Sequence, residues 1–139
     1  MISKKTKYGL QAVIILAKRF NTNPVLITDL ANEGHFPKKF LEAILLELRK
    51  SGILNSKKGK GGGYVLAKDP KDISIGDIIR TLDGSFSEIF FDEDNKENNE
   101  ITIILKEVRD AMSNILNKTT LANVIERASN GQNLLNYVI

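Results

Sequence analysis

The sequence contains no cysteine and only one histidine among its 139 residues. Without cysteine, a chain cannot form disulfides, thiolate zinc sites or cysteine-ligated iron–sulfur clusters. The single histidine, His35, makes a histidine-based catalytic or metal site hard to build, and we expect it to face solvent in the turn at 33–37. No nucleophile–base pairing is visible in the apolar surroundings that such chemistry needs. The sequence therefore predicts no enzyme, no metal ligands and no cofactor.

Long apolar runs are missing as well. No stretch reaches the roughly 18 apolar residues of a membrane span. The apolar segment 13–17 is short, and Lys18 and Arg19 follow it instead of the small residues of a signal-peptide cleavage site. We expect a cytoplasmic protein with no membrane partner.

Charge is distributed unevenly along the chain. Residues 1–80 hold 15 Lys and Arg against 7 Asp and Glu, a balance of +8, whereas residues 81–139 hold 5 against 10, a balance of −5. A basic first part and an acidic second part indicate that one segment meets a polyanion while the other has a different role. Lysine-rich surfaces are common, so the clustering of these charges is more informative than their sum.

The densest basic cluster is the segment 57–64, Lys-Lys-Gly-Lys-Gly-Gly-Gly-Tyr, between the short apolar runs 52–56 and 64–67. Glycine permits the positive φ angles of a tight hairpin and a close approach of the backbone to another surface. The pattern predicts a cationic β-hairpin that touches phosphates in or beside a groove of nucleic acid. The candidate contacts are Lys57, Lys58, Lys60, Gly61 and Gly62. A nucleotide-binding loop is excluded, because Tyr64 replaces the third glycine of the dinucleotide motif and no Gly-Lys-Ser/Thr follows.

Three helices are predicted before this hairpin, and one directly after it. They cover about 4–20 with Ser3 as N-cap, 27–33 ended by Gly34, 38–50 opened by Pro37, and 74–82 capped by Ser74. The predicted buried stripe of the third helix is Phe40, Leu41, Ile44, Leu45 and Leu48. Two helices joined by a tight turn and followed by a basic hairpin form a winged helix-turn-helix, so the predicted fold is mainly α with a small β-wing.

In a helix-turn-helix, the first turn of the second helix points at base edges. Lys38 and Lys39 can donate to guanine, although phosphate contact or plain solvation also fits them, and Glu42 can accept from cytosine N4. At the start of the first helix, Lys5, Lys7 and Tyr8 are candidates for clamping backbone phosphates. The alternative for this second group is an ordinary solvated helix start.

The second half of the chain is organised differently. We expect an acidic flexible linker at 85–100 between a DNA-binding domain at 1–84 and a dimerisation helix with a C-terminal tail at 101–139. The apolar seam of the long helix includes Ile101, Ile104, Leu105, Val108, Met112 and Ile115. Packing on its own core is the alternative, but the seam lies beyond the linker, which favours a homodimer interface. A last short helix, capped by Thr119-Thr120, is expected to end near 128, with Gly131 introducing the tail.

Residues 1–84 resemble the Rrf-two family of winged-helix transcription regulators. The resemblance rests on Lys-x-Lys-Tyr-Gly-Leu at 5–10, Phe-Leu-Glu at 40–42, the glycine-rich wing at 58–67 and Ile-Ser-Ile-Gly-Asp-Ile-Ile-Arg-Thr-Leu-Asp-Gly at 73–84. It implies a homodimer crossed through the long helix on a near-palindromic operator. It also implies that Glu42 reads bases, that Lys58 reaches the minor groove, and that Lys5 and Lys7 form the first-helix basic pair.

The chain departs from that family at the segment 85–100. Sensor members hold an iron–sulfur cluster there through three cysteines, and this cysteine-free variant has none. The resemblance extends to a tail with Tyr137, Val138 and Ile139, which implies cysteine synthase as a further partner, unless the tail merely packs on the dimer.

Taken together, these features predict a sequence-specific DNA-binding transcription regulator, a repressor that binds double-stranded DNA as a homodimer. The rival prediction is a winged-helix protein-interaction module that binds DNA weakly or not at all.

Overall fold

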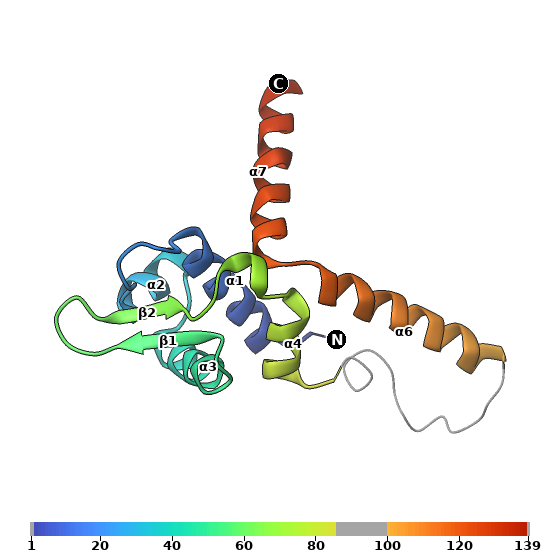
Figure 1. Ribbon diagram of the computed structural model, residues 1–139, viewed down its shortest axis with the longest axis horizontal. Coiled ribbons are helices and arrows are strands. Elements are labelled where there is room, and N and C mark those ends of the chain that lie inside the picture. Colours follow the sequence, from blue (N-terminus) through green and yellow to red (C-terminus); the bar gives the residue numbers. More distant parts are fainter. Residues whose placement is uncertain (1, 86–99, 139) are drawn as a thin grey trace.

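The computed structural model describes residues 2–85 and 100–138, with side chains described to residue 131. In chain order the elements are α1 (Lys4–Lys18), α2 (Ile27–Gly34), α3 (Lys38–Lys50), β1 (Leu54–Lys57), β2 (Gly63–Leu66), η1 (Pro70–Asp72), α4 (Ile75–Asp83), α6 (Glu100–Lys118) and α7 (Leu121–Val138) (Figure 1). The predicted fold class, mainly helical with a small β-wing, is confirmed.

Local chemistry explains most helix boundaries. The Ser3 hydroxyl accepts a hydrogen bond from the Thr6 N–H at 3.1 Å and so caps α1, as predicted. Ser74 and Asp77 form a reciprocal capping box at the start of α4. At the end of α2 the prediction was one residue early, because Gly34 is still helical and His35 takes the left-handed conformation with φ of 57°. His35 is exposed in this turn, as expected.

Helix α1 lies at the centre of the winged-helix core. It packs against α2, α3, α4, α7 and β2, which explains why its sequence is apolar on more than one side. Within α3, Leu41, Ile44, Leu45 and Leu48 are fully buried. Phe40 is not part of this stripe: its side chain is 39% exposed and its ring meets the Tyr8 ring edge-on, with centroids 5.6 Å apart.

The carboxylate of Asp83, at the end of α4, ties this helix to the start of α1. The Ser3 backbone N–H donates to Asp83 Oδ2 at 2.9 Å. Burial acts to raise the pKa of Asp83, but hydrogen bonds from Ser3 and the nearby Lys5 charge outweigh it, and the pKa lies below its ordinary 3.8. Ionised Asp83 therefore adds stability at neutral pH, and this contribution is lost as the pH falls from 3.8 through the lower folded-state value.

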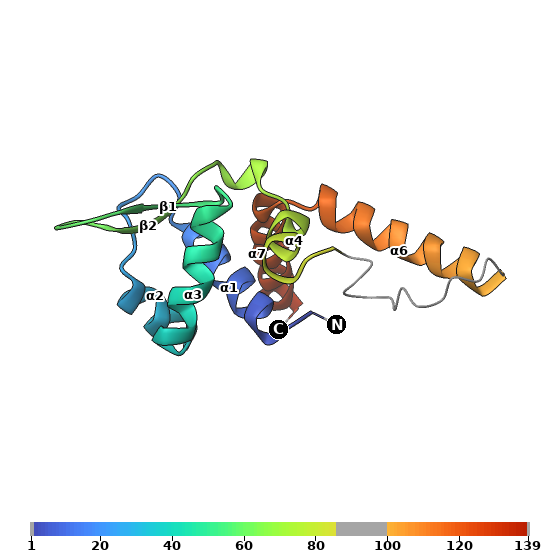
Figure 2. The ribbon, with the colours of Figure 1, turned by 90° about the horizontal axis from the view of Figure 1, so that it is seen from below.

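The hairpin of β1 and β2 projects from one end of the molecule, beside α2 and α3 (Figures 1 and 2). The strands are antiparallel, with Leu54 opposite Leu66 and Lys57 opposite Gly63. At its base, Tyr64 exchanges two backbone hydrogen bonds with Val25, at 2.8 and 3.0 Å. The wing is therefore anchored to the segment that leads into α2.

Helix α6 extends from the opposite end of the molecule, and its C-terminal end is joined to the core (Figures 1 and 2). The Ile75 N–H donates to the Thr119 carbonyl at 2.9 Å, and the Leu121 N–H donates to the Ile73 carbonyl at 3.0 Å. The Leu121 side chain is fully buried in the main core cluster. The segment 119–121 thus holds the long helix against α4, a contact that the sequence did not predict.

Helix α7 is longer than predicted, because it continues through Gly131 to Val138 instead of ending near 128. A glycine inside a helix costs only about 1 kcal/mol relative to alanine, which the surrounding turns can offset. The sequence-based expectation of a non-helical tail after Gly131 was therefore wrong.

Truncation of Leu121 tests how firmly this junction is docked. We expect Leu121→Ala to lower the free energy of unfolding by about 2–5 kcal/mol, the usual cost of a cavity at a fully buried leucine. Leu26→Ala is the matched control, because Leu26 is 53% exposed. Urea unfolding at equal protein concentration measures both; equal destabilisation by the two changes would show that the junction is not part of the core.

Candidate nucleic-acid interface

The wing presents its lysines to solvent. Lys57, Lys58 and Lys60 are all exposed, and within the part of the chain that the structure describes none of them pairs with an acid. Gly59 and Gly61 adopt φ angles of 88° and 76°, so the tight turn needs residues without a β-carbon. The ammonium groups therefore remain available to an external polyanion.

The exposed face of α3 carries the predicted recognition residues. Lys38, Lys39 and Glu42 are exposed in the first two turns of the helix, and none of them belongs to its buried stripe. Pro37 is the N-cap, so the first turn of the helix starts directly after the tight turn from α2. These three side chains are placed at the end of the helix that a helix-turn-helix directs toward base edges.

Three further residues on this face escaped the sequence analysis. Ala43 and Leu46 are exposed, Leu46 by 40%, and Arg49 Nη1 donates to Ser56 Oγ of β1 at 3.1 Å. Their spacing from Lys39 and Glu42 follows the helical repeat, a signal that attention to charge alone overlooks. The Arg49–Ser56 bond links the end of α3 to the wing, so helix and hairpin form one surface.

The three residues predicted to contact phosphates at the start of α1 differ in their surroundings. Lys7 is exposed, whereas Lys5 Nζ lies 2.8 Å from Glu47 Oε1 of α3, with both side chains partly exposed. The Tyr8 ring is half-buried and packs on Phe36 and Phe40, with centroid distances of 5.4 and 5.6 Å. Tyr8 thus stabilises the turn between α2 and α3, and Lys5 orients α3; contact of either with phosphate stays a prediction.

The apolar face of α6 is left uncovered by the part of the chain that the structure describes. Among its seam residues, Ile101, Ile104, Leu105, Val108 and Ile115 are 66%, 57%, 41%, 45% and 62% exposed, and Met112 is half-buried. No residue of α6 is buried. An unpartnered apolar face of this length favours association with another protein surface over packing on its own core.

Two other predicted regions fall outside the described residues. The acidic linker is described only at Ser85 and Glu100. The side chains of Tyr137 and Val138 and the whole of Ile139 lie beyond the described part, so the predicted partner-binding tail remains untested.

Within 2–85 and 100–138, no group of three or more His, Asp or Glu side chains is placed to hold a metal ion. No helix in these ranges combines the length and apolarity needed to cross a bilayer.

Known proteins resemble this chain over most of its length. The family model Rrf2, described as an iron-dependent transcriptional regulator, matches residues 2–127. An Rrf2-like HTH-type regulator of Rhodobacter capsulatus is 44% identical over 87 residues, which span 60% of this chain and only 58% of that protein. The regulator CymR of Bacillus subtilis is 36% identical over 124 residues, 88% of each chain. The solved structure of B. subtilis CymR superposes with a TM-score of 0.83 at 35% identity, covering 91% of this chain and 97% of that one.

An iron–sulfur cluster does not fit the donors of this chain. Iron–sulfur clusters are held by cysteine thiolates, and the sequence contains no cysteine and one histidine. The family, the relatives and the winged-helix architecture nevertheless agree, and the relatives are regulators, not enzymes. The chain therefore belongs to the Rrf2 family of winged-helix transcriptional regulators.

Proposed function

We propose that the protein represses transcription by binding a near-palindromic operator as a homodimer, with α3 in the major groove and the wing against the adjacent minor groove. The observation that carries the proposal is the exposed lysine cluster of the wing, free of acid partners within the described ranges and bonded to α3 through Arg49 and Ser56. Phosphate neutralisation by such lysines supplies affinity, and the exposed face of α3 supplies sequence readout.

The exposed seam of α6 supports the dimer in this proposal. Two copies that pair through this helix bury the apolar side chains and place two winged-helix units on one DNA duplex. A two-fold symmetric protein reads a site with matching symmetry, which is why the operator is expected to be near-palindromic.

Selection of bound fragments from the host genome, followed by transcription from a selected promoter, tests the proposal. We expect the fragments to share an inverted repeat and the protein to lower transcription from it. Fragments without any common sequence would contradict the proposal and favour the interaction module.

Base reading by Glu42 is tested at single positions of the selected operator. We expect Glu42→Ala to reduce the preference for one base pair in each half-site by about 10- to 100-fold, because the side chain that accepts from cytosine N4 is lost. Glu47→Ala is the matched control, since it removes the same side chain from α3, but at a position that pairs with Lys5. Competition binding against singly substituted operators measures both; an unchanged base preference in Glu42→Ala would exclude this role.

The tail remains a separate proposal. Similarity to a regulator whose structure is described as that of the global cysteine regulator of B. subtilis supports cysteine synthase as a partner of Tyr137, Val138 and Ile139. Removal of Ile139 should then weaken capture of the synthase without changing DNA binding.

A further inference from the structure

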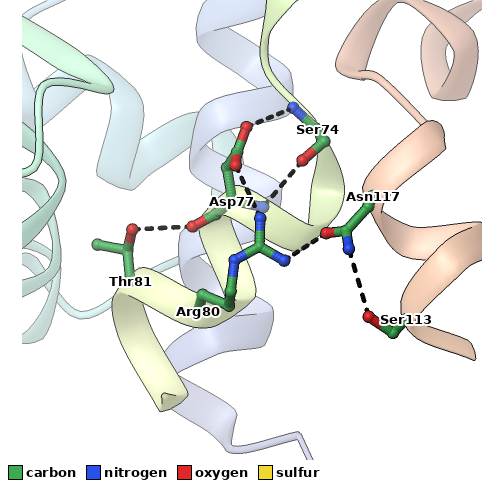
Figure 3. Close-up of polar contacts among 6 residues, drawn as sticks. All are labelled: Ser74, Asp77, Arg80, Thr81, Ser113 and Asn117. Carbon is green, nitrogen blue, oxygen red and sulfur yellow. Dashed lines mark hydrogen bonds and ion pairs between the residues drawn. The ribbon is translucent and has the colours of Figure 1, made fainter. Parts of the chain in front are cut away.

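A polar clasp joins α4 to the C-terminal end of α6 (Figure 3). The Arg80 guanidinium donates through Nη1 to Asn117 Oδ1 and through Nη2 to Asp77 Oδ1, the latter at 2.9 Å. Asn117 Nδ2 in turn donates to Ser113 Oγ, one turn earlier in α6, at 3.3 Å. The guanidinium therefore bridges a residue of its own helix and a residue of the long helix.

Hydrogen bonds to Ser74 hold the Asp77 carboxylate in place at the start of α4. Its Oδ2 accepts from the Ser74 N–H at 3.0 Å, and its own N–H donates to Ser74 Oγ at 3.0 Å. Burial acts to raise the pKa of Asp77, but hydrogen bonds from Ser74 and Arg80 outweigh it and hold the pKa below the ordinary 3.8. Asp77 is thus ionised at neutral pH and holds the guanidinium toward α6.

The backbone at this point leaves little room for adjustment. A β-carbon on Gly76 would collide with Asn117 Oδ1 and would lie 3.3 Å from the Leu116 carbonyl oxygen. One residue earlier in the chain, the Ile75 N–H donates to the Thr119 carbonyl at 2.9 Å. Close backbone approach and the side-chain clasp together set the angle at which α6 leaves the core.

A small change of this angle moves the far end of α6 by a large distance, because the helix is long. Its 19 residues span about 28 Å at 1.5 Å per residue, and α4, at its base, packs directly on α3. A rotation of about 10° at the clasp would move the far end of α6 by about 5 Å, which exceeds the 3.4 Å rise of one base pair. With 100° per residue, Asn117 lies on the side of α6 opposite the apolar seam, so it acts on the core and not on the dimer contact.

We propose that Arg80 and Asn117 are positioning residues that fix the spacing of the two operator half-sites which the dimer accepts. This inference rests on the proposed function, because it requires a dimer and a two-part operator. The clasp acts through the orientation of α6 relative to α3, and neither residue needs to touch DNA. Loss of the clasp should therefore widen the range of accepted spacings without changing the preferred half-site sequence.

The experiment uses the selected operator and versions with one base pair inserted or removed between the half-sites. For Asn117→Ala, we expect the preference for the native spacing to fall about three- to tenfold, the range for the net contribution of an ordinary intramolecular hydrogen bond, because this bond is exposed to water. Asn117→Asp keeps an acceptor for Arg80 and should retain the preference. Asn114→Ala is the matched control: the same residue type, exposed, three positions earlier in α6.

Two further measurements separate the possible failures. Sedimentation establishes that each variant is dimeric, and binding to the native operator establishes that it still recognises DNA. If Asn117→Ala remains a dimer on the operator and keeps the full spacing preference, the clasp inference is wrong while the proposed function stands. If the parent protein selects no two-part operator, the proposed function fails first, and the inference with it.

Discussion

Replacement of Lys58 and Lys60 by glutamate should abolish operator binding at physiological salt, with a loss of affinity of about a thousandfold or more. Both side chains are exposed on the wing. Because a dimer carries two wings, the double substitution reverses four charges. If each lysine contacts one phosphate, the slope of log K against log salt should become shallower by about 3.6, at 0.9 per contact. Titration by mobility shift at several salt concentrations measures both quantities.

The control for this change carries the same charge reversal elsewhere. Lys18→Glu with Lys71→Glu alters two exposed lysines, one at the end of α1 and one in η1. It should lower affinity only modestly through net charge, with little effect on the salt slope. Equal losses in the two double variants would mean that the wing makes no specific contact, and would favour the protein-interaction module.

Replacement of Ile104 and Val108 by glutamate should convert the protein to a monomer. These side chains are 57% and 45% exposed within one chain and lie one turn apart on the apolar seam. Burying half of each side chain across a dimer contributes about 3 kcal/mol for the four residues together, and buried carboxylates add a further penalty. The dimer dissociation constant should therefore rise at least about a hundredfold, as measured by analytical ultracentrifugation.

The fold of the single chain should survive this change, because α6 has no buried residue. Lys106→Glu with Asn114→Glu introduces the same side chains on the opposite side of the helix and should leave the dimer intact. Operator affinity should fall with the dimer in the first variant and stay within a few-fold of the parent in the second. A seam variant that remains dimeric would place the interface elsewhere.

The local elements were predictable because their signals lie close together in the chain. The Ser3 and Ser74 caps, the span of α3 and the glycine turn of the wing each depend on residues within a few positions of one another. The error at Phe40 arose where a tertiary contact competes with local preference. Phe40 has the spacing of a core residue, but the ring of Tyr8, from another helix, holds it at the surface.

The candidate site was predictable to a similar extent. Charge and glycine content located the wing lysines and the basic start of α3, and the structure leaves all of these side chains exposed. Pairing of Lys5 with Glu47 was not predictable, because it joins residues 42 positions apart on two different helices. Ala43 and Leu46 carry no charge, so attention to charge overlooked their helical spacing from Lys39 and Glu42, and their exposure on the folded helix reveals them.

By itself, then, the sequence determined the winged helix-turn-helix, the cationic wing and the exclusion of a thiolate cluster, since each depends on composition or on short-range spacing. Only the tertiary structure decided that α6 is held against α4 by Asn117 and by the strand-like contact at 119–121. Those contacts join segments about 40 residues apart, and no periodicity along the chain encodes which distant backbone groups will meet.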